Sequence, residues 1–259
     1  IQIKDDDTSA YIVAENTKIA FGRNSSIHSG NIVIDSSDKV GIGETSPDTI
    51  LHIKGTGDLL KLESTNAGDG GAQLDFYHQS TSTANNDLVG IINFGGDDSA
   101  GNATTYSRIS GIATNVSNGS EEGEIQFWTR TNASTFSEKV RIDNDGNVGI
   151  GTTSPKTHLD VQSYQADGIT IGADNDANRT RTNSTTKSGG ITGVHYLNAE
   201  ENIRIIGYDS FTDVNKVYIG GANGDWNAAT QIQFWTAATY NTTGGTKTLE
   251  IHPNKISGS

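Results

Sequence analysis

The sequence contains no cysteine and no methionine, only three prolines, and few apolar side chains. Without cysteine the chain can form no disulfide, no zinc–thiolate site and no thiol nucleophile. Hydrophobic residues account for 32% and aromatic residues for 7% of its 259 positions, so one copy of the chain has material for only a thin core. A chain of this kind folds by pooling apolar faces with neighbouring modules or with other chains.

Positive charge is also scarce, because 18 lysines and arginines stand against 31 aspartates and glutamates, which gives a formal net charge of −13. Such a chain has no basic patch to offset phosphate charge, and we expect neither nucleic acid nor an anionic membrane surface as a partner. No apolar run approaches the roughly 20 residues of a membrane span, so we expect no membrane insertion.

What the sequence does contain is an internal repeat. Residues 140–155 read VRIDNDGNVGIGTTSP, and residues 32–47 read IVIDSSDKVGIGETSP. A third copy starts with the LEI of residues 249–251 and runs out at the end of the sequence. A second landmark precedes each copy in turn: IAF at 19–21, IQFW at 125–128 and IQFW at 232–235.

Two landmarks that keep step with each other predict tandem modules rather than chance similarity. We expect the chain to be a piece of a longer polypeptide in which two modules are flanked by partial ones. The predicted boundaries are the end of a preceding module at 1–34, module A at 35–142, module B at 143–251, and the start of a following module at 252–259.

The repeated phrase predicts a β-hairpin. Val140 and Ile142 alternate with polar residues, residues 144–147 (NDGN) tolerate positive φ, and Val148 and Ile150 alternate again.

Two glycines and a proline mark the second arm of this hairpin. Gly149 and Gly151 have no side chain on the opposite face, which predicts close approach of another backbone or a bend. Pro155 cannot donate to a ladder, so the strand should end before the next apolar alternation, at Leu159 and Val161.

No stretch gives a helical stripe, and we predict an all-β fold. Module B repeats the beginning and end of module A but diverges between about residues 173 and 229. Strand-like alternation in module A is found at residues 51–54, 59–63, 72–78, 88–94, 106–113 and 124–130.

Four aromatic residues in the divergent part form the candidate binding site, namely Tyr208, Phe211, Tyr218 and Trp226. Aromatic rings among Asp, Asn and Gly suit a sugar, because a ring stacks on the apolar sugar face while amides and carboxylates meet its hydroxyls. The alternative is that these aromatics pack the strands of module B itself. Trp128 and Trp235 occupy the same module position and are expected to pack within it.

No motif for catalysis or for metal binding stands out. The run DNDAN at residues 174–178 resembles the start of a calcium loop but lacks its glycine and its distal glutamate. The six histidines have no metal-ligand spacing, and no phosphate-binding or hydrolase motif is present. We therefore predict a protein that is not an enzyme and that has no cofactor and no metal.

The phrase at residues 142–161, IDNDGNVGIGTTSPKTHLDV, resembles one found in the tail fibres, tailspikes and neck appendages of tailed bacteriophages. It also occurs in large bacterial surface proteins. The resemblance to the phage proteins implies an elongated fibre of tandem β modules, intertwined as a parallel homotrimer and located on the virion tail, outside the cell.

The resemblance makes a structural segment of a phage tail fibre the first hypothesis, with host attachment or receptor presentation as its role. Its implied partners are further copies of the same chain, other virion tail proteins and a host cell-surface glycan. A tailspike-type glycan-degrading enzyme and a bacterial surface adhesin are the alternatives. A long parallel β-helix would indicate the enzyme, and a signal peptide or cell-wall anchor in the full-length gene would indicate the adhesin.

Overall fold

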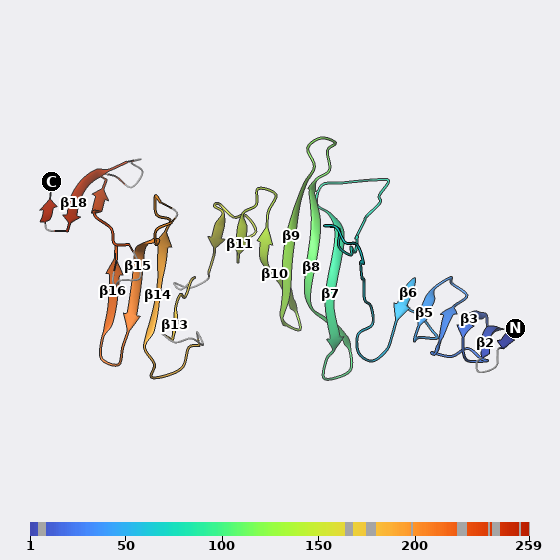
Figure 1. Ribbon diagram of the computed structural model, residues 1–259. Helices are drawn as coiled ribbons and strands as arrows, with labels where there is room; N and C mark the ends of the chain where they lie inside the picture. The colour runs from blue at the N-terminus through green and yellow to red at the C-terminus, as the bar shows by residue number, and fades with distance from the viewer. Residues whose placement is uncertain are drawn as a thin grey trace. The chain divides into compact units, whose positions relative to one another are not determined.

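The protein is all-β, and no helix occurs in the part of the chain that the structure describes. The computed structural model describes residues 1–4, 9–163, 168–174, 180–197, 199–221, 227–237, 239, 244–253 and 255–258. Figure 1 shows the strands following one another along the chain. Accordingly, no helix of these residues is long and apolar enough to cross a membrane.

The chain forms two compact units, Ile1–Gln79 and Ser80–Ser259. The first unit holds one six-stranded sheet in sequential order. Its strands are β1 (Gln2–Lys4), β2 (Ser9–Glu15), β3 (Lys18–Gly22), β4 (Asn31–Ile34), β5 (Val40–Ile42) and β6 (Leu51–Ile53).

The second unit holds three sheets of six, four and three strands, each also in sequential order. The six-stranded sheet consists of β7 (Asp87–Asp97), β8 (Ala103–Asn115), β9 (Glu122–Asn132), β10 (Thr135–Ile142), β11 (Val148–Ile150) and β12 (Leu159–Val161). The four-stranded sheet consists of β13 (Ala173–Asp174), β14 (Lys187–Gly193), β15 (Ile203–Ser210) and β16 (Asn215–Ile219). The three-stranded sheet consists of β17 (Ile232–Thr236), β18 (Thr246–His252) and β19 (Lys255–Gly258).

The sequence repeat corresponds to one strand pattern. Strands β3, β4 and β5 pair antiparallel, and β6 adds to β5 in parallel. Strands β9 to β12 repeat this order, and β17 to β19 repeat its antiparallel part. Ile34, Ile142 and Ile251 occupy equivalent positions in the three copies, because they pair with Ile19, Ile125 and Ile232 respectively. The module boundaries depend on which residue is chosen as the start of the repeating unit, and they stay a prediction.

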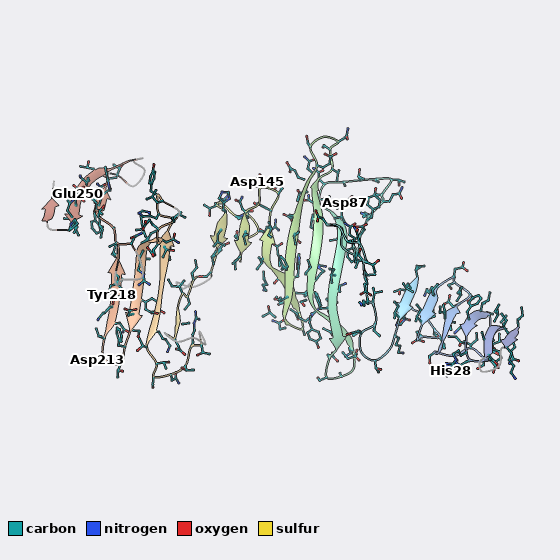
Figure 2. All side chains as sticks on the ribbon, in the orientation of Figure 1. His28, Asp87, Asp145, Asp213, Tyr218 and Glu250 are labelled. Carbon is teal, nitrogen blue, oxygen red and sulfur yellow. The ribbon has the colours of Figure 1, made fainter. Side chains whose placement is uncertain are left out.

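The predicted hairpin turn is present and is organised by an aspartate. The Asp143 carboxylate accepts hydrogen bonds from the backbone N–H groups of Asp145 (3.0 Å) and Asn147 (2.8 Å). Asp145 lies in the loop between β10 and β11 (Figure 2), and Gly146 has a φ of +80°. The same bonds to residues two and four positions on recur at Asp35 and at Asp98. A side chain that satisfies its own turn stabilises a tight loop locally.

Gly149 and Gly151 let the chain turn tightly after β11, so that β12 can pair with β11 in parallel. A Cβ on Gly149 would lie 2.7 Å from the Thr152 carbonyl oxygen, and one on Gly151, whose φ is +75°, would overlap the Gln162 carbonyl. Gly41 and Gly43 repeat both features in the first unit. The predicted close approach is therefore confirmed, and the neighbouring backbone belongs to the same chain. The glycine pair is explained within one copy and is no evidence for assembly.

Two predicted strands are wrong. Residues 59–63 and 72–78 belong to no strand, and Leu60 and Phe76 in them are exposed. Apolar and polar residues do alternate in both segments. A strand, however, also requires a neighbouring strand whose backbone accepts and donates the ladder hydrogen bonds. Among the described residues, no strand pairs with either segment.

Candidate functional surfaces

An exposed apolar face runs across the sheet of the first unit. Residues that are opposite each other in register lie on the same face, and the pairing places Ile12 beside Phe21, Phe21 beside Ile32, and Ile32 beside Ile42. Phe21 is 43% exposed and Ile32 46% exposed. We call this face the apolar ladder of the sheet, and its second row is made by Ala14, Ile19, Ile34, Val40 and Leu51.

The second unit carries the same apolar ladder twice. On the six-stranded sheet the register joins Ile92, Ile109, Phe127, Val140, Ile150 and Val161. On the three-stranded sheet it joins Phe234 to Leu249 and Ile232 to Ile251. Phe127 is 37% exposed and Phe234 43% exposed. Three sheets thus present one apolar face of the same construction to solvent.

The apolar ladders are exposed because the described residues form almost no hydrophobic core. Among the described residues, the buried hydrophobic side chains are Ala20 and Val33. Within each unit, all substantial contacts between the described strands join neighbours in the same sheet, so none of these strands forms a second layer over a ladder. Exposed apolar surface on this scale marks an interaction surface, because water contact costs about 25 cal/mol for each Å².

The opposite face of the first sheet is covered by the chain's own loops. Asn31 is 3% exposed, and its side-chain amide donates to the carbonyls of Asn24 and Ser26. The Lys18 ammonium donates to the Ser46 hydroxyl (3.2 Å) and to the Thr45 carbonyl. This face is closed within one copy, which leaves the apolar ladder as the open one.

On the six-stranded sheet the opposite face is a polar network. Arg141 binds both carboxylate oxygens of Glu138 at 2.7 Å and one oxygen of Glu124 at 2.8 Å. Glu124 also accepts from Gln126, whose side-chain oxygen accepts the Trp128 indole N–H at 3.0 Å. The fork geometry of arginine suits this double carboxylate contact.

The three-stranded sheet repeats this network with the charges exchanged. Glu250 stands where Arg141 stands, and the Lys247 ammonium binds it at 2.7 Å. Trp235 again donates to the glutamine two residues before it, Gln233, at 3.2 Å. Trp235 therefore matches Trp128, as predicted. The Trp128 ring stacks with Phe136 and lies under the Arg108 guanidinium, so it packs within the module.

Two ion pairs, Glu44–Lys54 and Glu250–Lys247, predict a lower folding stability in acid. A side-chain hydrogen bond from Lys54 lowers the pKa of Glu44 to about 2, and one from Lys247 lowers that of Glu250 to about 2. A carboxylate whose pKa is lower in the folded than in the unfolded state stabilises the fold, because the folded state favours the charged form. This stabilisation is fully present above the ordinary carboxyl pKa of about 4.3, and it is lost as the pH falls through about 2. We expect the melting temperature to fall across this window. The double variant Glu44→Gln, Glu250→Gln should show a smaller fall, and an equal fall would contradict the assignment.

The structure places the predicted aromatic residues on different sides of one sheet. Tyr208 pairs with Val217 and Tyr218 pairs with Gly207, so the two tyrosines point to opposite faces. The Tyr208 hydroxyl donates to the Ile171 carbonyl at 3.0 Å. The Tyr218 hydroxyl donates to the Asp209 carboxylate at 2.6 Å, and this bond raises the pKa of Tyr218. Tyr218 projects from β16 (Figure 2).

The remaining two aromatics lie apart from Tyr208. Phe211 lies under the Lys216 ammonium at 5.1 Å, and Lys216 shares its face with Tyr218. Trp226 lies outside the described residues. The structure thus groups Phe211 with Tyr218 and separates them from Tyr208, and a glycan-binding role for these residues stays a prediction.

The Asp174 carboxylate is occupied by protein donors. It accepts hydrogen bonds from the side chains of Thr180, Thr182 and Thr185 and pairs with Lys187 at 2.9 Å. The hydrogen bond from Lys187 is the largest of several that hold its pKa well below the ordinary range. The rest of the DNDAN run falls outside the described residues, and within them no group of three or more acidic or histidine side chains could hold a metal ion.

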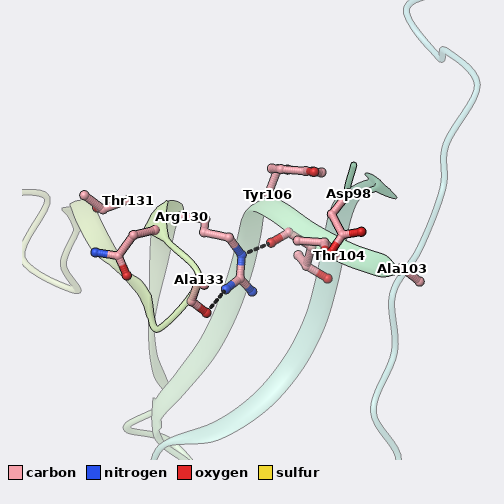
Figure 3. A pocket seen from close by; sticks show the side chains of 9 residues that line it. Asp98, Ala103, Thr104, Tyr106, Arg130, Thr131 and Ala133 are labelled. Atoms are coloured by element: carbon pink, nitrogen blue, oxygen red, sulfur yellow. Dashed lines mark hydrogen bonds between the residues drawn. The ribbon is translucent and has the colours of Figure 1, made fainter. Parts of the chain in front are cut away.

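A pocket of about 710 Å³ lies between the β7–β8 and β9–β10 hairpins. Figure 3 shows the Arg130 side chain donating to the carbonyls of Thr105 and Ala133. The lining is polar, and its members are Asp98, Ala103, Thr104, Thr105, Tyr106, Arg130, Thr131, Asn132 and Ala133.

Sequence reasoning missed this pocket because two hairpins build it. The one available signal in the sequence was that Arg130, the cation of the pocket, departs from the repeat. Arg130 stands where the first copy has Asn24 and the third has Ala237. A charged residue at a position that the framework does not constrain points to a local role.

No protein-family model matches the chain, and no curated protein matches it. Among solved structures, it is similar to the carboxy-terminal domain of the bacteriophage T5 L-shaped tail fibre, with 12% sequence identity and a TM-score of 0.39. The match covers 77% of this chain and 90% of that domain.

Proposed function

We propose that this chain is a structural segment of a bacteriophage tail fibre that assembles as a homotrimer through its apolar ladders. The observation that carries the proposal is that three sheets expose the same apolar face while the described residues bury only Ala20 and Val33 as hydrophobic core. A single copy would leave these apolar faces in contact with water.

A second copy of the chain is the occupant that suits these ladders. Their residues are almost entirely Ile, Val, Leu and Phe, so a like face meets a like face without burying a charge. Residues 59–63 and 72–78 pair with none of the strands that the structure describes, and another copy can supply a partner. The number three comes from the resemblance of residues 142–161 to tail-fibre sequences, since an open face by itself requires only that another copy covers it.

In this proposal the segment lies on the virion tail, outside the cell, beside other tail proteins, and contributes to host attachment by holding or presenting a receptor surface. The repeated phrase and the assembly face support it. Antibody fragments raised against the chain, applied to phage particles that encode it, should label the fibres in electron micrographs. Labelling of the capsid, or of no part of the particle, would contradict the location.

A further inference from the structure

The Arg130 guanidinium is held in place before any ligand arrives. Its Nε donates to the Thr105 carbonyl at 2.8 Å, one Nη donates to the Ala133 carbonyl at 3.0 Å, and the Phe136 ring lies 5.3 Å from its centre. No carboxylate lies within ion-pair distance of it among the described residues. A guanidinium oriented in this way keeps N–H groups for a ligand at little further cost in side-chain entropy.

The other pocket residues offer hydroxyls, an amide, a ring and a carboxylate. Tyr106 is 46% exposed, so much of its side chain is accessible. Asp98 uses one oxygen for the N–H groups of its own turn, while the other accepts from the Asn102 side chain. That second oxygen can accept further hydrogen bonds. One cation and one carboxylate therefore line the same pocket.

The pocket opens on the face that assembly leaves free. Arg130 and Trp128 alternate along β9 with Phe127 and Thr129, so Arg130 lies on the polar face. Tyr106 lies at an irregularity of β8, between the pairs Phe94–Ser107 and Gly95–Thr105, and lines the same pocket as Arg130. The apolar ladder, with Phe127, occupies the opposite face. Covering the ladder with another copy would leave this pocket on the exposed side of the sheet.

We propose that this pocket binds a neutral saccharide. Sugar hydroxyls donate and accept at once, which matches a fixed guanidinium and a carboxylate with spare capacity better than an anion or a cation does. The Tyr106 ring provides a flat apolar surface for a sugar ring. An acidic sugar is disfavoured by Asp98 and by the net charge of −13. The site differs from the Tyr208 to Trp226 region and does not depend on the assembly state.

Saturation-transfer NMR on the full chain tests this, with the methyl glycosides of glucose, galactose, mannose and N-acetylglucosamine and with glucuronate as the acidic comparison. We expect transfer to at least one neutral glycoside and none to glucuronate. Arg130→Gln should weaken that binding about tenfold, as expected for a lost hydrogen bond to a charged group. The matched control Arg23→Gln removes an exposed arginine elsewhere and should change nothing.

A pair of tyrosine variants keeps the test decisive if Arg130→Gln does not fold. Tyr106→Phe retains the ring and should bind, whereas Tyr106→Ala should not. Transfer to no neutral glycoside, a preference for glucuronate, or equal binding by Tyr106→Ala would overturn the proposal. Light scattering on the same samples separates the two proposals: an assembled protein that binds no sugar refutes only the pocket, and a single chain that binds sugar refutes only the assembly.

Discussion

Replacement of Phe127 by aspartate is expected to convert the assembled protein into single chains. Phe127 lies at the centre of the apolar ladder of the six-stranded sheet, between Ile109 and Val140. Assembly through this face would bury its ring, and each lost phenylalanine removes about 1.5–3 kcal/mol of burial. The new carboxylate must also be desolvated in each copy without a partner, which costs more again. Light scattering should show the mass fall to that of one chain.

Ser120→Asp is the matched control for this variant. It adds the same charge in the exposed β8–β9 loop of the same unit, away from the ladder. We expect its mass to equal that of the wild type. If Phe127→Asp keeps the full mass and the wild-type melting temperature, the ladder is not the assembly surface.

Gly151→Val should cause a large loss of folding stability. The valine Cβ would overlap the Gln162 carbonyl, which belongs to the backbone and cannot turn away. A β-branched residue is also strained at a φ of +75°. Together these effects should cost about 2–5 kcal/mol, measured by denaturant unfolding at one protein concentration.

Gly146→Asn separates crowding from backbone conformation. Gly146 has a φ of +80°, close to that of Gly151, but no atom lies within 4 Å of the position that its Cβ would take. The first repeat already carries Asp38 at the equivalent place, with a φ of 61°. We expect a change of less than about 1 kcal/mol. A loss as large as that of Gly151→Val would show that φ alone explains the glycines. A wild-type midpoint for Gly151→Val would show that the crossover is not as close as described.

The repeated frame could be predicted from sequence because each of its parts is specified locally. Val140 and Ile142 reveal their face by alternation, and the Asp143 turn is closed by its own side chain. Gly149 and Gly151 predict the close approach of a backbone segment, although the sequence does not show whether that segment belongs to the same chain or to another copy. These signals span a few residues each, so they survive without knowledge of the tertiary structure.

The features that sequence could not supply depend on partners and register. Residues 59–63 alternate like a strand but pair with no described strand, because alternation along one segment does not determine whether a partner is available. Tyr208 and Tyr218 looked like one cluster until the register of β15 and β16 placed them on opposite faces. The pocket around Arg130 draws on two hairpins, so no single stretch of sequence contains its pattern.

If further copies of the same chain cover the apolar ladders, the protein in solution is an assembly and not a single chain. The most direct test is the mass of the wild-type protein in solution by multi-angle light scattering, followed by thermal unfolding of the same sample. We expect three times the chain mass of 27.4 kDa and a melting temperature that rises with protein concentration. A particle of 27.4 kDa that melts cooperatively at a temperature independent of concentration would contradict it.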